Sequence, residues 1–293
     1  MFFTKKRTYK QHYNEKDSFY KYSSPKFTEQ QALSENLNTD ICIVGGGLTG
    51  ISAALNLADQ GYDVCIVEAN KIGSGASGRN GGQLGIGMRK DQLYLENKFG
   101  FEKAEFFWNV GLDAVKNVTN LISKYNIDCA LKPGILHAGN TKKDYKYFIE
   151  EIEHMKSKYS YDNYEYFDEN SIKDEVNTDQ YYSGLLTKDS FHLNPLKLTY
   201  GLANECLNKN IKIFENSPID KIEEKSDNVL LFSKKAVIKS KKVIVACNGY
   251  LDNLLGSVRN FFMPINNYII ATEPLGEKLA RQIIKRDCGV VDS

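Results

Sequence analysis

The stretch from Thr39 to Glu68, TDICIVGGGLTGISAALNLADQGYDVCIVE, limits the possible folds of this chain more than any other. Its apolar pattern predicts a buried strand, then a glycine turn, a helix and a second buried strand. We expect these elements over residues 41–44, 45–47, 48–60 and 64–67. Gly45, Gly47 and Gly50 form G-x-G-x-x-G, which permits a tight turn, a close approach to a pyrophosphate and packing of helix on strand.

Glu68 ends the second strand, about 18 residues after Gly50. A carboxylate at this position can accept hydrogen bonds from both hydroxyls of an adenosine ribose, and it would repel the 2′-phosphate of NADP. The N–H groups at the start of the helix favour a phosphate group. Together these features predict a dinucleotide site. The alternative is a glycine turn that only packs a βαβ unit.

A second glycine-rich stretch, KIGSGASGRNGGQLGIG, runs from Lys71 to Gly87. So much glycine is costly in a regular helix or strand, but it lets backbone N–H groups face a ligand closely. A plain NAD dehydrogenase has no evident need for such a loop after the acid, whereas a flavin dinucleotide must also seat its ring. The alternative is a flexible linker. The side chains here that can form hydrogen bonds are Ser74, Ser77, Arg79, Asn80 and Gln83.

Composition excludes several classes of protein. Hydrophobic residues make up 42% and charged residues 26% of the 293 residues, with a net charge of +1, so nothing indicates binding to nucleic acid. Six scattered cysteines without a C-x-x-C pair indicate a reducing, cytoplasmic setting and no metal site. The start, MFFTKKRTYKQ, contains no apolar run typical of a signal peptide, and we expect no integral membrane segment.

The rest of the chain alternates helical and strand patterns. Helices are expected over 101–124, 142–160, 195–208 and 275–285. Strands are expected over 129–138, 184–187, 211–214, 243–246 and 263–273, with a small meander over 219–222, 229–232 and 236–238. The acidic stretch 161–175 is expected to be a solvated loop with a short helix.

Six motifs follow one another along the chain: Val44–Gly50, Glu68, Gly75–Gln83, Lys132–Leu136, His192–Pro195 and Val243–Tyr250. Together they resemble the FAD-dependent amine and amino-acid oxidoreductases of the D-amino-acid oxidase superfamily. Within it, the chain is most similar to the gamma-glutamylputrescine oxidase group. The resemblance implies an α/β (α+β overall) fold, in which a Rossmann-like FAD-binding domain is interleaved with an antiparallel-sheet substrate domain.

This resemblance gives expected domain boundaries. An N-terminal arm occupies 1–37, the FAD-binding domain 38–87 and 195–255, and the substrate domain 88–194 and 256–293. Family members continue well beyond the last residue of this chain. We therefore expect the chain to be C-terminally truncated and its substrate domain to be incomplete.

Candidate binding residues follow from the motifs and the resemblance. The turn after the strand 243–246 lies at a carboxyl end, where ligands collect, and in the family the backbone matching Ile219 meets the adenine. The candidate FAD-binding residues are Gly45, Gly47, Leu48, Thr49, Gly50, Glu68, Ala69, Ser77, Arg79, Asn80, Gly81, Gly82, Gln83, Ile219, Ala246, Asn248 and Gly249. Tyr250 and Tyr268 are candidates for a substrate pocket. No catalytic residue is indicated.

The resemblance implies oxidation of a C–N bond of an amine or amino acid to an imine, with hydride transfer to the flavin and reoxidation by oxygen or another electron acceptor. Its closest branch points to a gamma-glutamylputrescine-like substrate. Two alternatives stay open. One is an NAD-dependent dehydrogenase, which uses the same first motif. The other is a non-catalytic flavoprotein fragment or subunit, which the expected truncation makes plausible.

Overall fold

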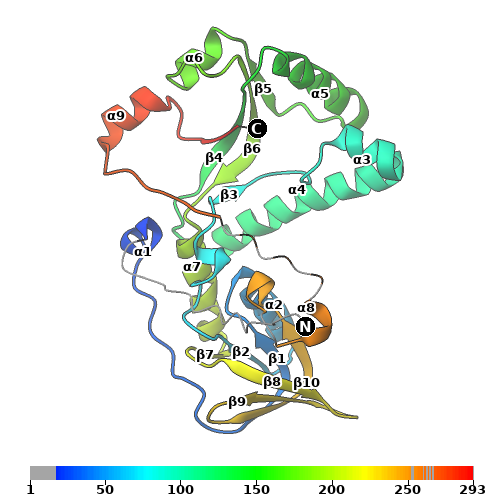
Figure 1. Cartoon of the computed structure of the whole chain (residues 1–293), viewed down its shortest axis with the longest axis vertical. Coiled ribbons are helices and arrows are strands. Elements are labelled where there is room, and N and C mark those ends of the chain that lie inside the picture. The colour runs from blue at the N-terminus through cyan, green and yellow to red at the C-terminus, as the bar shows by residue number, and fades with distance from the viewer. Residues whose placement is uncertain are drawn as a thin grey trace, which may run out of the picture. The chain divides into compact units, whose positions relative to one another are not determined.

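A computed structural model describes residues 18–251, 254–259, 261, 263, 265 and 267–292. The described chain divides into two compact units (Figure 1). Unit 1 combines the residues up to Asn80 with Pro195–Ile269, and unit 2 combines Gly81–Asn194 with Ile270–Ser293. Each unit is therefore built from two stretches that are distant in sequence, as expected of interleaved domains.

Unit 1 contains a six-stranded sheet in the order β7-β2-β1-β10-β9-β8. The first four strands in this order are parallel, and β9 and β8 continue the sheet in antiparallel fashion. The strands are β1 (Leu37–Val44), β2 (Val64–Val67), β7 (Lys212–Phe214), β8 (Ile219–Glu224), β9 (Val229–Ser233) and β10 (Val237–Val245).

Both faces of the central strands are covered. Cys42 and Val44 of β1 pack into a core with Val67 and Ile238, while Ile43 faces the helix that follows β1. This explains the uninterrupted apolar run from Ile41 to Val44, which burial on one face alone would not require.

Helices α2 (Leu48–Asp59) and α7 (Pro195–Asn208) pack against each other in unit 1 (Figure 1). Both present small or branched side chains to the core, among them Ala54 of α2 and Ala203 of α7, each without exposed surface. The shorter elements of this unit are α1 (Phe19–Ser23), η2 (Ala76–Gly78), η3 (Asn248–Tyr250) and α8 (Gly256–Arg259).

Unit 2 contains a five-stranded sheet centred on a long strand, β6 (Ser183–His192). β6 pairs in antiparallel fashion with β4, β3 and β5, and β11 adds to β4 in parallel. The remaining strands are β3 (Gln83–Leu84), β4 (Lys132–Gly139), β5 (Tyr164–Phe167) and β11 (Gly289–Asp292). The sheet is thus antiparallel apart from one parallel pair.

Helices of unit 2 contribute to two hydrophobic cores on or beside this sheet. Ile172 of α6 joins Leu136, Phe167 and Leu186 in one core, and Trp108 of α4 joins Met155 and Tyr161 in another. The helices are α3 (Gln92–Phe99), α4 (Phe101–Lys124), α5 (Asp144–Tyr159), α6 (Ser171–Glu175) and α9 (Gly276–Ile283). None of the described helices has the length and apolar character needed to cross a membrane.

Most predicted elements are confirmed, and three predictions are wrong. The stretch 161–175 is not simply a solvated loop with a helix, because β5 pairs with β6 and Tyr161 is buried. The predicted strands 236–238 and 243–246 are one strand, β10, whose first half pairs with both β1 and β9. None of the described residues from 263 to 273 lies in a strand, and Tyr268 is 87% exposed.

That last error has a simple physical cause. An apolar, β-branched sequence can form a strand only when a neighbouring strand satisfies its backbone N–H and C=O groups. The described side chains in this stretch are exposed, including Ile265, Ile269 and Ile270. The local sequence pattern therefore predicted a strand that the described residues of this stretch do not form.

Candidate dinucleotide site

The glycine turn after β1 is held by close backbone contacts within unit 1. Gly45 has φ +117°, and a Cβ on it would lie 2.5 Å from the carbonyl oxygen of Ala246, at the end of β10. A Cβ on Gly50 would lie 2.1 Å from the carbonyl oxygen of Gly45. The first and third glycines of the motif are therefore required by the tight turn and by the packing of α2 on β1, as the sequence predicts.

Gly47 and Ser77 bring the two glycine-rich stretches together. The hydroxyl oxygen of Ser77 accepts a hydrogen bond of 2.9 Å from the backbone N–H of Leu48, the first residue of α2. A Cβ on Gly47 would lie 2.7 Å from the same oxygen. The second stretch therefore lies against the N-terminus of α2, where backbone N–H groups favour an anion. Thr49 lies exposed in the first turn of this helix.

Glu68 leaves the end of β2 and turns toward the glycine turn. Its Oε2 accepts a hydrogen bond of 2.7 Å from the N–H of Gly46, and its Oε1 accepts one of 2.9 Å from the N–H of Asn70. Burial raises the pKa of Glu68 above its ordinary value; the two N–H donors oppose this rise, and the charge of Glu215 adds to it. The acid and the glycine turn thus form one hydrogen-bonded arrangement.

The loop from Gly73 to Asn80 is fixed by contacts with its own backbone and with η3. Arg79 donates from Nη2 to the hydroxyl of Tyr250 at 3.2 Å and from Nε to the carbonyl of Gly75 at 3.3 Å. Asn80 donates from Nδ2 to the carbonyl of Ser77 at 3.0 Å. These hydrogen bonds tie the loop to its own backbone and to η3 within unit 1.

The other candidate residues fall into three groups. Ala246, Asn248 and Gly249 lie at the carboxyl end of β10, beside the glycine turn, because Ala246 donates its N–H to the carbonyl of Val44 at 2.8 Å. Ala69 follows Glu68, and Ile219 begins β8. Gly81, Gly82 and Gln83 lie in unit 2, whereas Tyr268 lies in an irregular segment of unit 1.

Within unit 1, the glycine turn, the start of α2 and Glu68 offer a place for a dinucleotide at the carboxyl edge of the parallel strands. β1 lies between β2 and β10, so the sheet extends from β1 in both directions. Open α/β sheets bind ligands at such a switch point, beyond the carboxyl ends of the strands. The glycine turn, the N-terminus of α2 and the acid of β2 all lie at this edge. A Cβ on Gly45, Gly46 or Gly47 would lie less than 3 Å from a neighbouring protein atom, so only glycine lets the turn pack this closely against its neighbours.

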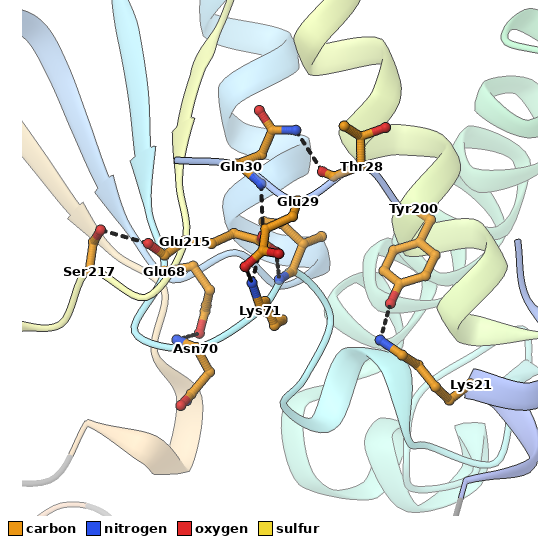
Figure 2. A network of polar contacts seen from close by, with 11 residues as sticks. Lys21, Thr28, Glu29, Gln30, Glu68, Asn70, Lys71, Tyr200, Glu215 and Ser217 are labelled. Atoms are coloured by element: carbon orange, nitrogen blue, oxygen red, sulfur yellow. Dashed lines mark hydrogen bonds and ion pairs between the residues drawn. The ribbon is translucent and has the colours of Figure 1, made fainter. Parts of the chain in front are cut away.

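The sequence did not reveal a second acid beside Glu68, namely Glu215, which follows β7. Its side chain is 2% exposed and its Oε1 accepts a hydrogen bond of 2.8 Å from the N–H of Ile72, in the loop that follows Glu68 (Figure 2). Its Oε2 accepts one of 3.0 Å from the N–H of Gln30 (Figure 2). The one signal that could have indicated Glu215 was its position directly after β7, a parallel strand next to β2.

Unit 1 has the architecture of a dinucleotide-binding α/β domain with a glycine fingerprint and an acidic second strand. A family model described as FAD dependent oxidoreductase matches residues 40–292. The chain therefore belongs to the FAD dependent oxidoreductase family, and FAD is the cofactor of that family.

Individual relatives agree with this assignment. The chain is 34% identical over 276 residues to gamma-glutamylputrescine oxidoreductase of Escherichia coli K12, covering 94% of this chain and 64% of that protein. It is 23% identical over 259 residues to glycine oxidase of Bacillus licheniformis, covering 86% of this chain and 66% of the relative. The chain thus spans slightly less than two thirds of the length of these curated relatives.

Solved structures share the fold. Glycine oxidase from Geobacillus kaustophilus matches with a TM-score of 0.61 and 18% identity, over 75% of this chain and 58% of that one. L-Amino acid deaminase from Proteus myxofaciens, solved in complex with anthranilate, matches with a TM-score of 0.59 and 20% identity, over 75% of this chain and 48% of that one.

Proposed function

We propose that unit 1 binds FAD and that the protein oxidises a C–N bond of an amine or amino acid. The observation that carries the proposal is the hydrogen bond between the N–H of Gly46 and the carboxylate of Glu68, which puts the acid of β2 directly beside the glycine turn of β1. A ribose-binding acid and a pyrophosphate-binding turn must lie this close to serve one dinucleotide.

Each part of the site has a role in this proposal. The N–H groups of the glycine turn and of the first turn of α2 bind the pyrophosphate, and Glu68 accepts hydrogen bonds from the adenosine ribose. Ser77 and Arg79 bring hydroxyl and guanidinium donors to the same edge of the sheet. The backbone of Ile219 contacts the adenine, and the turn at Asn248 and Gly249 contacts the flavin half.

Unit 2 is proposed to serve the substrate, chiefly through the sheet centred on β6. When bound, FAD supplies the acceptor for a hydride from the carbon that bears nitrogen, and water then hydrolyses the resulting imine. A neutral amine needs no protein base for this step, so we assign no residue of the chain a catalytic role. Tyr250 and Tyr268 stay candidates for substrate contacts.

The substrate proposed is a glutamylated polyamine. It is supported by the 34% identity to the Escherichia coli gamma-glutamylputrescine oxidoreductase, which extends over 94% of this chain. Glycine, sarcosine and D-amino acids are oxidised by enzymes of the same architecture and are the competing substrates. Oxygen or another electron acceptor would complete the cycle.

An absorption spectrum tests the cofactor proposal. The purified chain is mixed with FAD, freed of excess ligand and scanned for flavin absorption, with NAD as a parallel ligand in a binding titration. Retained flavin at one per chain is the expected result. A chain that binds NAD and no FAD would instead be a dehydrogenase of the first alternative class.

Anaerobic bleaching of the bound flavin tests the substrate proposal. Gamma-glutamylputrescine is compared with putrescine, glycine, sarcosine and a D-amino acid at equal concentrations. We expect the glutamylated amine to bleach the flavin fastest. Bound flavin that none of a broad amine panel bleaches would support a non-catalytic flavoprotein.

A further inference from the structure

A short segment ahead of β1, residues 28–33, is anchored to unit 1 by specific contacts rather than lying as a solvated arm. Gln30 donates its N–H to Oε2 of Glu215, and Leu33 donates its N–H to the hydroxyl of Ser217 at 2.8 Å. Leu33 is 4% exposed and packs into the core beside Val67 of β2. Glu29 forms an ion pair with Lys71 (Figure 2).

Glu215 and Ser217 belong to the loop between β7 and β8, and this loop is hydrogen-bonded to the loop that follows Glu68. Glu68 donates its N–H to the carbonyl of Phe214, and Ser217 donates its N–H to the carbonyl of Glu68, each at 2.8 Å. Asn216 donates its N–H to the carbonyl of Asn70 at 2.8 Å. Both the N–H and the carbonyl of Glu68 are therefore hydrogen-bonded to the segment 214–217.

The carboxylate of Glu215 joins the anchored segment 28–33 to the loop that follows Glu68 (Figure 2). One carboxylate oxygen binds the N–H of Ile72 and the other binds the N–H of Gln30, while Nζ of Lys71 lies 3.5 Å from Oε2. Ile72 in turn packs against the glycine turn, because its Cδ1 lies 2.4 Å from where a Cβ on Gly46 would be. A buried carboxylate with two backbone donors fixes both of its partners strongly.

We propose that Glu215 is a positioning residue for the adenosine end of the dinucleotide site, and that docking of segment 28–33 and binding of FAD strengthen each other. This proposal rests on the proposed binding of FAD in unit 1. Glu215 acts through the loop from Glu68 to Ile72, which bears the ribose-binding acid and contacts the glycine turn. If docking of the segment raises the affinity for FAD by some factor, thermodynamic linkage requires that bound FAD raise the equilibrium constant for docking by the same factor.

Limited trypsin digestion measures docking directly. Lys26 is exposed and lies just ahead of the anchored segment, so release of a product that begins at Phe27 reports undocking. In the wild-type chain we expect saturating FAD to slow this cleavage several-fold. The same digestion without FAD measures how well the contacts with unit 1 alone hold the segment in place.

Two substitutions weaken docking by different chemistry. Glu215→Gln keeps one acceptor oxygen, but its amide nitrogen cannot accept the second backbone N–H. Ser217→Ala removes the acceptor for Leu33 and the hydrogen bond of 2.8 Å that the hydroxyl donates to the backbone carbonyl of Glu215, but it keeps the carboxylate of Glu215. Each should raise the dissociation constant for FAD about tenfold, the scale of one hydrogen bond to a charged or buried group. Each should also accelerate cleavage after Lys26 in the absence of FAD.

The matched control is Glu224→Gln, the same change at an exposed position at the end of β8. It should leave both the affinity for FAD and the rate of cleavage unchanged. The ratio of cleavage rates with and without saturating FAD separates positioning from a merely structural role. We expect Glu215→Gln to bring this ratio close to one, whereas a general loss of stability would accelerate both rates and preserve it.

The outcomes distinguish the two proposals. If the wild-type chain binds no FAD, the proposed function is wrong, and the inference that rests on it fails with it. If the wild type binds FAD but both variants bind it equally well, or if FAD leaves the cleavage ratio of the wild type at one, Glu215 has no positioning role and only the further inference is overturned.

Discussion

The backbone nitrogen of Gly46 lies 2.7 Å from Oε2 of Glu68 and donates a hydrogen bond to it. This contact joins the turn after β1 to the end of β2, so the two parts of the dinucleotide fingerprint form one structural unit. A substitution at either position is therefore expected to affect both the turn and the acid, and the two predictions for Glu68 below depend on this relationship.

Gly47→Val should abolish binding of FAD. A Cβ at this position would lie 2.7 Å from the hydroxyl oxygen of Ser77, and the branched side chain would occupy the space beside the N-terminus of α2. Equilibrium dialysis with FAD measures the loss. Gly256→Ala is the control, since nothing lies within 4 Å of a Cβ there, and its affinity should match the wild type. Undiminished binding by Gly47→Val would move the pyrophosphate elsewhere.

Glu68→Ala should weaken FAD binding by about 1–3 kcal/mol, the usual scale for hydrogen bonds to a charged group. The variant also leaves the N–H of Gly46 without its carboxylate acceptor. Quenching of flavin fluorescence on titration gives the dissociation constant. Glu224→Ala, at an exposed site in β8, provides the comparison. Equal affinities for the two variants would exclude Glu68 as the ribose ligand.

The affinity for FAD should fall in mild acid because Glu68 must be ionised to accept hydrogen bonds from two ribose hydroxyls. Burial raises the pKa of Glu68, so protonation begins at a higher pH than for an ordinary glutamate. We expect the dissociation constant to rise as the pH falls through this raised pKa. Glu68→Gln should remove that dependence; a variant that keeps the wild-type pH profile would assign the titration to another group.

Arg286→Ala should destabilise unit 2. Arg286 donates two hydrogen bonds to Glu165, at 2.8 and 2.9 Å, and its Nε lies 2.8 Å from Oε2 of the buried Glu175. Among the described residues, removing it leaves the carboxylate of Glu175 with the longer contact to Lys285 alone, which should cost about 2 kcal/mol in urea unfolding. The exposed pair of Arg281 and Asp287 provides the control, and Arg281→Ala should cost less than about 1 kcal/mol.

The sign of the pH effect provides a second check on Arg286. Its hydrogen bonds hold the pKa of Glu165 below the ordinary value. The stability that this pair contributes is therefore fully present above the ordinary glutamate pKa and is lost as the pH falls through the lowered one. The difference in unfolding free energy between wild type and Arg286→Ala should shrink in acid. A difference that grows in acid would contradict this account.

The buried thiols should be unreactive in the native protein. Burial raises the pKa of Cys206 to about 12, and it is fully buried against α2. Cys288 is only partly buried. A timed reaction with an aromatic disulfide at pH 8, followed by peptide mass spectrometry, should label Cys288 well before Cys206. Rapid labelling of Cys206 would show that this part of unit 1 opens readily.

Much of unit 1 could be predicted because its sequence carries local signals. One conformation is strongly favoured for each of three features, the run Ile41–Val44, the glycines and Glu68. β2 also spans the predicted residues 64–67. Helix α7 begins at Pro195, as the Asn-Pro dipeptide predicts. These are interactions between residues close in sequence, or strong preferences of single residues.

What the sequence did not reveal depends on distant partners. Glu215 is one acid among many until the fold brings Gln30 and Ile72 to its carboxylate. The stretch around Tyr164 appeared polar and solvated, yet its alternating tyrosines form β5 because β6 offers an edge. The prediction for the apolar stretch around Tyr268 is wrong for the opposite reason. Its pattern suits a strand, but none of its described residues pairs with another strand.

The pairing of β1 with β10 has a consequence for how the protein is made. The N–H of Cys42 in β1 binds the hydroxyl of Ser240 in β10, 198 residues later in the chain. At 5–20 residues per second, a ribosome needs roughly 10–40 s to synthesise that interval. During this time one edge of β1 has no partner strand while the whole first part of unit 2 emerges. Assembly of the parallel sheet therefore waits on translation, and until β10 has been made this edge of β1 can pair with other chains.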